Sequence, residues 1–507
     1  MFKVLKNLKE SWISVITIVL LLIVQAAGDL TLPDYTSKIV NVGIQNGGIE
    51  NVAPEVIRKS EMENMLIFTE EDDKILESYE EISKDNLDSA EYEKLVKKYP
   101  ALENESLYKI KKISSSEQDE LDSLMAKPLM MLSVTKQMPK GQLDQMLETV
   151  NQKIDDMQES ILEQAAIQEV KNEYKAIGMN TDSIQNQYII MAGLKMLGIS
   201  LIIMISAISI MCLSARVAAR LAKTLREKVF KKVLRFSNKE FSEYSTASLI
   251  TRSTNDIQQI QGLIAILFRV LVYAPIIGIG GFLRVLNQSD NSMAWIIGVA
   301  IVAILFVVAT LFIIAMPRFK KLQQLIDKLN LVAREILTGL PVIRAFNTEK
   351  KEEKRFDNMD LTKTNLFVNR AMSFMMPTLM LIMNGISLLI VWVGAHGIDN
   401  GTMQVGNMMA FIQYTMQIVM SFLMISMVSI MLPRASVSAN RINEIIETEE
   451  TIKDSKEPKK LNPNKKGLVE FKNVSFRYPD SDEEVLSDIS FTAEPGKTTA
   501  IIGSTGS

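Results

Sequence analysis

Six stretches of the chain are apolar over a length that fits a lipid bilayer. Each holds roughly 17 or more predominantly hydrophobic residues, which is what an α-helix needs to cross a hydrocarbon core of roughly 30 Å. A segment in lipid must satisfy its own backbone hydrogen bonds, so runs of this length predict transmembrane helices. The six predicted spans are Trp12–Gly28, Tyr188–Leu213, Leu263–Leu286, Met293–Met316, Met372–Ile398 and Met403–Leu432.

The helical pattern continues beyond these spans. From Tyr188 to Phe236 the chain runs for 49 residues without a proline, and a helix of that length extends roughly 70 Å, more than twice the bilayer core. The fourth span continues past Pro317 with apolar residues at helical spacing. These residues are Leu322, Leu325, Leu329, Val332 and Ile336. Extensions of this kind indicate a transporter that transmits force from a cytoplasmic motor, since a channel with short loops has no need of them.

Lysine and arginine concentrate on one side of the predicted spans. They are frequent before the first span, after the second and between the fourth and fifth, whereas the short loops Asn287–Ser292 and Asp399–Thr402 have none. The positive-inside rule therefore predicts that both termini are cytoplasmic, with Arg284, at the outer end of the third span, as a mild exception. Residues 46–187 hold 30 Asp and Glu against 16 Lys and Arg. Their net charge of −14 leaves +11 for the rest of a chain whose net charge is −3, so this acidic block is predicted to lie outside the cytoplasmic (plasma) membrane.

Residues 46–187 are expected to fold as a small helical domain outside the membrane. Their apolar positions recur at helical intervals, most clearly in Gln142–Lys175. The domain is either a solvated lid or spacer, or a device for substrate capture or partner sensing, and its acidity would concentrate cations near the exit. One cysteine, Cys212, and one histidine, His396, exclude a disulfide framework and an ordinary Cys/His zinc site.

The C-terminal residues of the sequence match the beginning of a phosphate-binding loop. After a turn at Pro495 and Gly496, the apolar segment Thr499–Ile502 is expected to form a short strand that leads into a glycine-rich run. In the motif G-x-x-x-x-G-K-[ST], successive backbone N–H groups surround nucleotide phosphates. The second glycine, the lysine and the hydroxyl residue would occupy the three positions after this run. The matching residues, which alternatively form an ordinary turn, are Gly503, Ser504, Thr505, Gly506 and Ser507.

Four segments together resemble the ABC exporter family. Residues 236–256 (FSNKEFSEYSTASLITRSTND) are similar to the first intracellular loop of that family, and residues 334–347 (REILTGLPVIRAFN) to the second. Residues 435–446 resemble the helix that leads to the nucleotide-binding domain, and residues 469–479 (VEFKNVSFRYP) resemble the start of that domain. The resemblance covers about residues 3–44 and 188–507 and leaves out the acidic insert. Bacterial multidrug-type half-transporters, including heterodimers with an enlarged outer loop on one partner, are the most similar subgroup.

The resemblance implies a mostly α membrane protein. Six long transmembrane helices with an extracytoplasmic helical insert would be followed by the truncated start of an α/β nucleotide-binding domain. The segments Ser237–Leu249 and Pro341–Asn347 would contain coupling helices, the second of which docks on the partner's nucleotide-binding domain. The expected divisions are 1–45 (N-terminus and first helix), 46–187 (insert), 188–447 (helices two to six), 448–467 (linker) and 468–507 (start of the nucleotide-binding domain).

The resemblance also implies the nucleotide chemistry. Tyr478 matches the aromatic residue that stacks on adenine, which we favour over the alternative of an aromatic that only packs in a β-sheet, and residues 503–507 match the first part of the phosphate loop. ATP and Mg²⁺ are expected only with the intact nucleotide-binding domain. The sequence contains no phosphate-loop lysine, glutamine loop, signature motif, magnesium-binding aspartate or catalytic glutamate. No catalytic or metal-binding residue is therefore assigned, and the chain alone is not expected to hydrolyse ATP.

A methionine stripe is the main candidate for the substrate path. Its members are spaced so that they share one face of the sixth span, and methionine surfaces repack around varied apolar ligands, but helix packing explains them equally well. The stripe consists of Met416, Met420, Met424, Met427 and Met431. Gln413 either lines a cavity or bonds between helices. Arg269 is an expensive charge in the third span that either faces the cavity or lies at the cytoplasmic boundary, which we favour.

These observations lead to one functional hypothesis and its rivals. The chain is expected to be half of a dimeric ABC transporter, paired with a second half-transporter subunit, with a heterodimer favoured over a homodimer. It would export hydrophobic or amphipathic compounds, or alternatively peptides or lipids, in contact with membrane lipids and without any nucleic acid. The rivals are a membrane sensor that does not transport and an inert scaffold that ends at Ser507.

Overall fold

The computed structural model describes residues 6–137, 159–286, 293–357, 359–452, 457, 467–478 and 482–503. Most of these residues are helical, as the sequence predicts. Six helical segments in the described part of the chain are long and apolar enough to cross a membrane, and each overlaps one predicted span, which confirms the prediction of six. The segments are Leu8–Gln45, Thr181–Val233, Thr246–Leu286, Ala294–Ala315, Glu349–Asp399 and Val405–Ile425.

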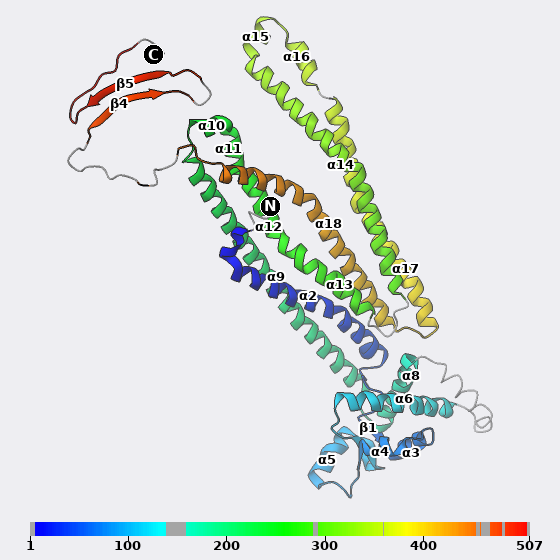
Figure 1. Ribbon diagram of the computed structural model, residues 1–507. Coiled ribbons are helices and arrows are strands. Elements are labelled where there is room, and N and C mark those ends of the chain that lie inside the picture. The colour runs from blue at the N-terminus through cyan, green and yellow to red at the C-terminus, as the bar shows by residue number, and fades with distance from the viewer. Residues whose placement is uncertain are drawn as a thin grey trace. The chain divides into compact units, whose positions relative to one another are not determined.

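The chain divides into two compact units. The first is drawn from residues 1–12, 215–265 and 431–507, and the second from residues 13–214 and 266–430. Helices α9 (Thr181–Val233) and α18 (Val405–Glu447) each continue from one unit into the other (Figure 1). The 53 residues of α9 give it a length of about 80 Å, so the predicted extension of the second span beyond the bilayer is confirmed.

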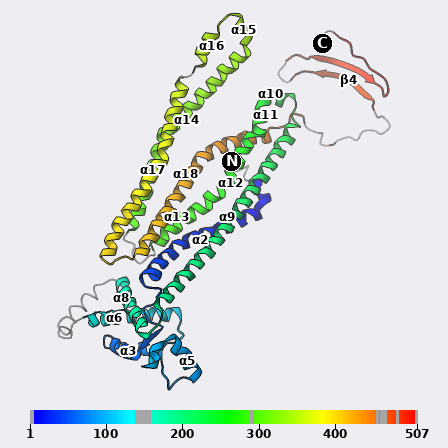
Figure 2. The same ribbon diagram turned by 180° about the vertical axis from the view of Figure 1, so that it is seen from behind.

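The second unit holds most of the membrane-spanning helices. They are α2 (Trp12–Lys38), η2 (Ile39–Gln45), η4 (Arg269–Tyr273), α13 (Ala274–Leu286), α14 (Ala294–Thr338) and α17 (Met359–Asp399), together with most of α18. Helices α14 and α17 lie side by side in both views (Figures 1 and 2). Apolar side chains of α2, α13, α14, α17 and α18 form one buried cluster, in which Phe411 and Ile418 are fully buried. Gly281 lets α13 approach α18 closely, because a Cβ there would lie 2.9 Å from Ile418 Cγ1.

The first span is longer than the sequence analysis predicted. The predicted end at Gly28 is wrong, since α2 continues to Lys38 and the π-helix η2 carries the helical path to Gln45. The prediction stopped at the first carboxylate, Asp29. Transmembrane helices tolerate both proline and paired polar residues, because neighbouring helices satisfy the groups that are left without partners. Pro33 and two aspartates therefore lie inside the helix.

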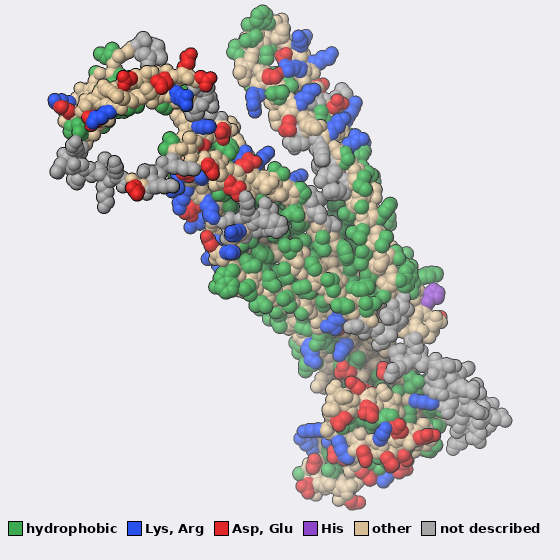
Figure 3. Space-filling model, in the orientation of Figure 1, with side chains coloured by type: hydrophobic (Ala, Val, Ile, Leu, Met, Phe, Trp, Pro, Cys, Tyr) green, Lys and Arg blue, Asp and Glu red, His purple; other side chains and the backbone are tan. Residues whose placement is uncertain are grey.

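The insert also belongs to the second unit and is not purely helical. Its helices are α3 (Lys59–Leu66), α4 (Asp72–Glu77), α5 (Ser89–Lys98), η3 (Pro100–Glu103), α6 (Ser115–Gln137) and α8 (Glu159–Ile177). They surround a three-stranded antiparallel sheet of order β1-β3-β2, formed by β1 (Val56–Arg58), β2 (Tyr79–Ile82) and β3 (Leu107–Ile110). The expected helix Gln142–Lys175 is observed as α8 from Glu159, and residues 142–158 lie outside the described part. Charged side chains are scattered over the insert surface, whereas the spanning helices present apolar ones (Figure 3).

The first unit contains short helices and two strands. The helices, besides the ends of α9 and α18, are η1 (Lys6–Ser11), α10 (Asn238–Glu243), α11 (Thr246–Ser253) and most of α12 (Asn255–Phe268). Strands β4 (Val469–Phe476) and β5 (Leu486–Ala493) pair antiparallel, with Val469 opposite Ala493 and Phe476 opposite Leu486. The stacked rings of Phe471 and Phe491, with centroids 4.6 Å apart, stabilise this pair.

Candidate functional site

The predicted adenine-stacking residue follows strand β4. Tyr478 lies two residues after Phe476, the last residue of β4, and its ring meets that of Phe476 edge-on with centroids 5.2 Å apart. More than half of the Tyr478 side chain is exposed. The predicted phosphate loop is only partly described: Gly503 is placed and exposed, whereas Ser504, Thr505, Gly506 and Ser507 lie outside the described residues. No hydrogen bond or ring contact joins Tyr478 to Gly503 within the described part.

The expected strand at Thr499–Ile502 is absent from the described structure. The turn at Pro495 and Gly496 is present, with Gly496 at a positive φ of 74°. Beyond it, residues 497–503 have no regular structure, and Ile501 and Ile502 are almost fully exposed. An apolar strand needs neighbouring strands to pair its backbone and cover its side chains. Among the described residues, β5 pairs only with β4, so nothing supports a strand at this position.

A polar cluster in the first unit joins the loop after α9 to the segment after α18. We call Ser237, Glu240, Tyr244, Thr448 and Thr451 the coupling cluster. Ser237 caps α10 in a capping box with Glu240, and the Glu240 carboxylate accepts hydrogen bonds from the Ser237 N–H at 2.6 Å and the Thr451 N–H at 3.0 Å. Tyr244 and Thr448 are joined through their hydroxyls at 3.0 Å. Hydrogen bonds from Ser237, and then from Thr451, lower the pKa of Glu240 to about 2, so the carboxylate is ionised at neutral pH.

Three further contacts strengthen the same connection. Arg252 on α11 donates to the backbone oxygen of Arg441 at 2.8 Å and pairs with Glu444 at 2.7 Å, both on α18. Ser438 donates to the buried carboxylate of Asp256 at 2.8 Å. The predicted first coupling segment, Ser237–Leu249, is observed as α10 and the start of α11. The structure therefore links it to the polypeptide that leads into β4.

The loop that the sequence analysis matched to a second intracellular loop follows the C-terminal end of α14. Helices α15 (Leu340–Ala345) and α16 (Glu349–Phe356) follow α14, and the predicted coupling segment Pro341–Asn347 covers most of α15. Val342 and Phe346 project into solvent. An open apolar hollow of about 450 Å³ lies between α14, α15 and α16. It is lined by Ala333, Ile336, Leu337, Leu340, Ile343, Glu349, Glu352, Glu353 and Phe356. An exposed apolar surface of this kind is typical of a protein contact.

The predicted methionine stripe lies on α18, and its described members differ in exposure. Met416 and Met420 are exposed, Met424 and Met431 are half-buried, and the side chain of Met427 lies outside the described part. The opposite face of α18 packs into the core through Phe411, Tyr414 and Ile418. Packing inside this chain therefore covers Met416 and Met420 only in part, since 39% of Met416 and 49% of Met420 remain exposed. Gln413 is half-buried.

Arg269 lies where the third span changes helix type. It is the first residue of the π-helix η4, is exposed, and lies 5.8 Å from the ring centre of Tyr273, one turn further on. The Tyr273 hydroxyl donates to Asp29 on α2 at 2.7 Å. The sequence analysis missed Asp29 and Asp34. The signal that would have revealed them is the continued apolar pattern after Gly28, which places both carboxylates inside a span.

A polar clamp connects the C-terminal end of the first span to the N-terminal end of the sixth. The buried Asn41 in η2 accepts from the Gly406 N–H at 2.7 Å and donates to Asn407 Oδ1 at 3.1 Å, and Ser37 donates to the same oxygen at 2.7 Å. Gly406 lies in the first turn of α18, where N–H groups have no partner within the helix. Asn41 therefore caps α18 from a different helix. Nearby, Tyr414 donates to the backbone oxygen of Leu30 at 3.0 Å and to the Asp34 carboxylate.

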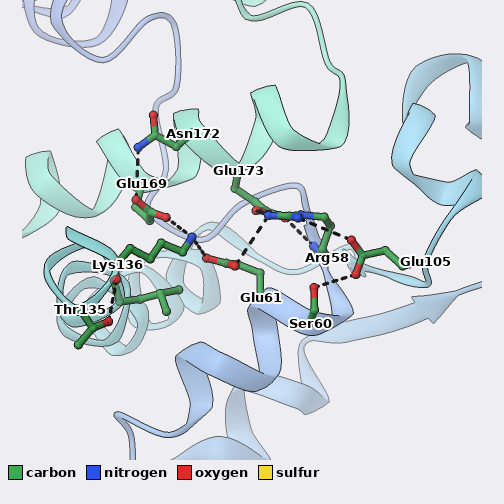
Figure 4. Close-up of polar contacts among 10 residues, drawn as sticks. Arg58, Ser60, Glu61, Glu105, Thr135, Lys136, Glu169, Asn172 and Glu173 are labelled. Atoms are coloured by element: carbon green, nitrogen blue, oxygen red, sulfur yellow. Dashed lines mark hydrogen bonds and ion pairs between the residues drawn. The ribbon is translucent and has the colours of Figure 1, made fainter. Parts of the chain in front are cut away.

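A cluster of buried ion pairs stabilises the insert (Figure 4). Arg58 on β1 makes a bidentate contact with the buried Glu173 of α8, with distances of 2.7 and 2.9 Å, and this hydrogen bonding raises the pKa of Arg58. Lys136 on α6 pairs with Glu169 at 2.6 Å and with Glu61. Within the described residues no three acidic, histidine or cysteine side chains converge to hold a metal ion. The cluster therefore joins β1 and α3 to α6 and α8 rather than forming a metal centre.

Comparison with known proteins identifies the family. The family model of the ABC transporter transmembrane region matches residues 143–422. An uncharacterized ABC transporter ATP-binding protein of Mycobacterium tuberculosis is 38% identical over 323 residues, which cover 63% of this chain and 55% of the relative. A second uncharacterized ABC transporter ATP-binding protein, from Bacillus subtilis, is 34% identical over 301 residues, 58% of this chain and 51% of the relative.

A third relative carries a more specific name. The ATP-dependent lipid A-core flippase of Pseudomonas aeruginosa is 30% identical over 304 residues, which cover 58% of this chain and 48% of the flippase. The chain spans about half the length of the curated relatives that it matches. Because the family model covers more than half of its residues, the chain belongs to the ABC transporter transmembrane-region family, as a multi-pass membrane protein built like an exporter half-transporter.

Proposed function

We propose that the chain is one half of an ATP-driven exporter of hydrophobic or amphipathic compounds. The observation that carries the proposal is the coupling cluster, which joins the loop after α9 to the segment between α18 and β4. A displacement of the nucleotide-binding domain would pull on Thr448 and Thr451 and would reach α9 through Glu240 and Tyr244. Because α9 is about 80 Å long, it would carry that displacement across the whole bilayer.

ATP, with Mg²⁺, would bind in the intact nucleotide-binding domain. Tyr478 would stack on the adenine, and the run that begins at Gly503 would surround the phosphates. In the full-length protein we expect Tyr478→Ala to weaken ATP binding by roughly two- to tenfold, as expected from one aromatic stacking contact. Tyr478→Phe keeps the ring and should bind like the wild type. If Tyr478→Ala binds ATP with the affinity of the wild type, Tyr478 is not part of the ATP site.

The working unit would be a dimer with a second half-transporter, and we favour a different subunit over a second copy. The hollow at the tip of α14, with the exposed Val342 and Phe346, would dock on the partner's nucleotide-binding domain. Lysine and arginine near the inner ends of the spans support cytoplasmic termini and an insert outside the plasma membrane. We propose the same five divisions as above: the N-terminus and first helix (1–45), the insert (46–187), helices two to six (188–447), the linker (448–467) and the start of the nucleotide-binding domain (468–507).

Transport into inside-out membrane vesicles tests the proposal. Vesicles that contain the full-length protein and its partner should accumulate a fluorescent amphipathic compound only when ATP and Mg²⁺ are supplied, and vanadate or omission of Mg²⁺ should abolish the accumulation. No transport, together with a conformation that ignores nucleotide, would favour the membrane sensor instead. Lipids are the second candidate cargo, because one relative is named a lipid A-core flippase. Measuring the transport of a labelled lipid in the same vesicles distinguishes a lipid cargo from an amphipathic compound.

A further inference from the structure

The two aspartates on α2 differ in whether a positively charged side chain lies beside them. Asp34 is neutralised, since Arg284 of α13 lies 2.9 Å from its carboxylate and the Tyr414 hydroxyl donates to it. Asp29 lies five residues earlier, close to the middle of the span Leu8–Gln45. Within the described residues no Lys, Arg or His comes within ion-pair distance of Asp29. A carboxylate inside a membrane span without a counter-ion is costly and marks a functional site.

The groups that contact Asp29 are neutral. The Tyr273 hydroxyl donates to Asp29 Oδ2 at 2.7 Å, and the amide nitrogen of Gln417 donates to the Asp29 backbone oxygen at 2.9 Å. Asp29 Oδ1 makes no hydrogen bond with any described residue. Tyr273 ends a π-helix, and π-helical segments occur frequently at functional sites.

Among the described residues around Asp29, two polar atoms have no hydrogen-bond partner, and both are acceptors. One is Asp29 Oδ1, and the other is Gln417 Oε1, which is buried and has no hydrogen-bond partner in the described structure. Exchanging the positions of Oε1 and Nε2 of Gln417 would not remove the need for a further hydrogen-bond donor, because the Asp29 backbone oxygen would then lose the N–H group from which it accepts. A ligand that completes this arrangement must therefore bring hydrogen-bond donors, and an ammonium group would supply them together with a positive charge that neutralises Asp29.

The adjacent surface is apolar. Met416 precedes Gln417 on α18 and Met420 lies one turn from Met416, and both side chains are exposed. The Tyr273 ring offers an aromatic face, which Arg269 approaches to 5.8 Å, so this face accepts a cation. A carboxylate, an aromatic ring and flexible methionines together match a molecule with one cationic end and one apolar end.

We propose that Asp29, with Tyr273 and Gln417, binds the protonated amine of an amphipathic cargo. The inference rests on the proposed export function and narrows its cargo to compounds that carry an ammonium N–H group. Tyr273 would orient the carboxylate, and Gln417 would accept a second N–H of the amine.

The test compares an amphipathic primary amine with its neutral amide analogue in the full-length complex. Equilibrium binding without ATP and ATP-driven transport are both measured for wild type, Asp29→Asn and Asp34→Asn. We expect Asp29→Asn to weaken amine binding by about tenfold or more, as for loss of a charged hydrogen bond, and to leave the amide analogue within about twofold. Asp34→Asn removes the same charge from the same helix and should not change the ratio of amine to amide.

Each outcome decides one question. Equal amine binding in wild type and Asp29→Asn overturns the site, whereas retained handling of the amide shows that the variant is folded. If Arg269→Gln restores amine binding to Asp29→Asn, Asp29 is only the counter-ion of Arg269, and the inference is wrong. A wild-type complex that binds the amine through Asp29 but transports neither compound would refute the export function and leave the binding site standing.

Discussion

Replacing Gly406 by alanine tests the contact between the C-terminal end of α2 and the N-terminal end of α18. A Cβ at position 406 would lie 2.5 Å from the backbone oxygen of Ser37 and would also overlap Asn41 Oδ1. Non-bonded heavy atoms attract best at roughly 3.5–4.0 Å, so α18 would have to move away by about 1 Å. The Ser37 oxygen belongs to a helix backbone and does not yield as the end of a flexible side chain does.

The expected cost can be assembled from three contributions. Overpacking costs about 1–3 kcal/mol, and loss of the bond between Asn41 and the Gly406 N–H adds about 0.6 kcal/mol, the average for interhelical hydrogen bonds in membranes. Alanine recovers up to about 1 kcal/mol through its higher helix propensity. The net destabilisation is therefore about 2 kcal/mol, which lowers the ratio of folded to unfolded protein roughly thirtyfold.

A matched control separates this clash from any general effect of losing a glycine. Gly385 lies in α17, and no atom lies within 4 Å of a Cβ built there, so Gly385→Ala should be neutral or stabilising by up to about 1 kcal/mol. Unfolding of the detergent-solubilised full-length protein by increasing mole fractions of SDS measures both variants. If Gly406→Ala unfolds at the same SDS content as the wild type, the close approach of α2 and α18 is wrong.

Two further predictions concern the insert and the coupling cluster. Arg58→Met leaves the buried Glu173 without its partner and should destabilise the insert by about 3 kcal/mol. The control Lys59→Met breaks the exposed pair with Glu81 and should cost less than about 1 kcal/mol. Equal protease resistance of the two variants in the full-length protein would contradict this difference. The pKa of Glu240 is lowered from 4.5 to about 2, so its stabilising contribution is complete above pH 4.5 and is lost as the pH falls to about 2. The protection of the amides of residues 448–452 against hydrogen exchange, relative to their intrinsic exchange rates, should fall over that range in the wild type, whereas Glu240→Gln should show low protection already at neutral pH and no such fall.

The number of spans was predictable because it depends on a local property. Twenty apolar residues in a row need lipid or a core around them wherever they lie, and the proline-free sequence of α9 predicts a straight helix without reference to any other segment. The same reasoning failed at α2. Its continuation past Asp29 and Pro33 depends on Tyr273, Arg284 and Tyr414. These partners are some 250 to 380 residues away in the sequence, and no local pattern connects them to α2.

The insert shows a second limit of prediction from sequence. Its strands have only three or four residues each, which is too short for an alternating pattern to stand out from the surrounding helices. The predicted strand at Thr499–Ile502 is the converse case. Four apolar residues favour a strand, but a strand exists only beside another strand, and within the described residues none lies next to it. Tyr478, the methionine stripe and the phosphate loop remain predictions, because their role depends on ligands and partners.

The coupling cluster has a physical task that follows from a difference between α9 and α18. Pro433 interrupts the hydrogen bonding inside α18, so a force applied to its C-terminal end would bend the helix there before it reached the methionines. Helix α9 has no proline over its 53 residues. In the proposed exporter, the cluster would pass the load to the helix that does not bend, because it joins the polypeptide after Pro433 to the loop after α9 through Glu240 and Thr451. Loss of Glu240 should therefore uncouple nucleotide binding from the N-terminal half of α9 while leaving nucleotide affinity intact, and spin labels at the two ends of α9 would report it.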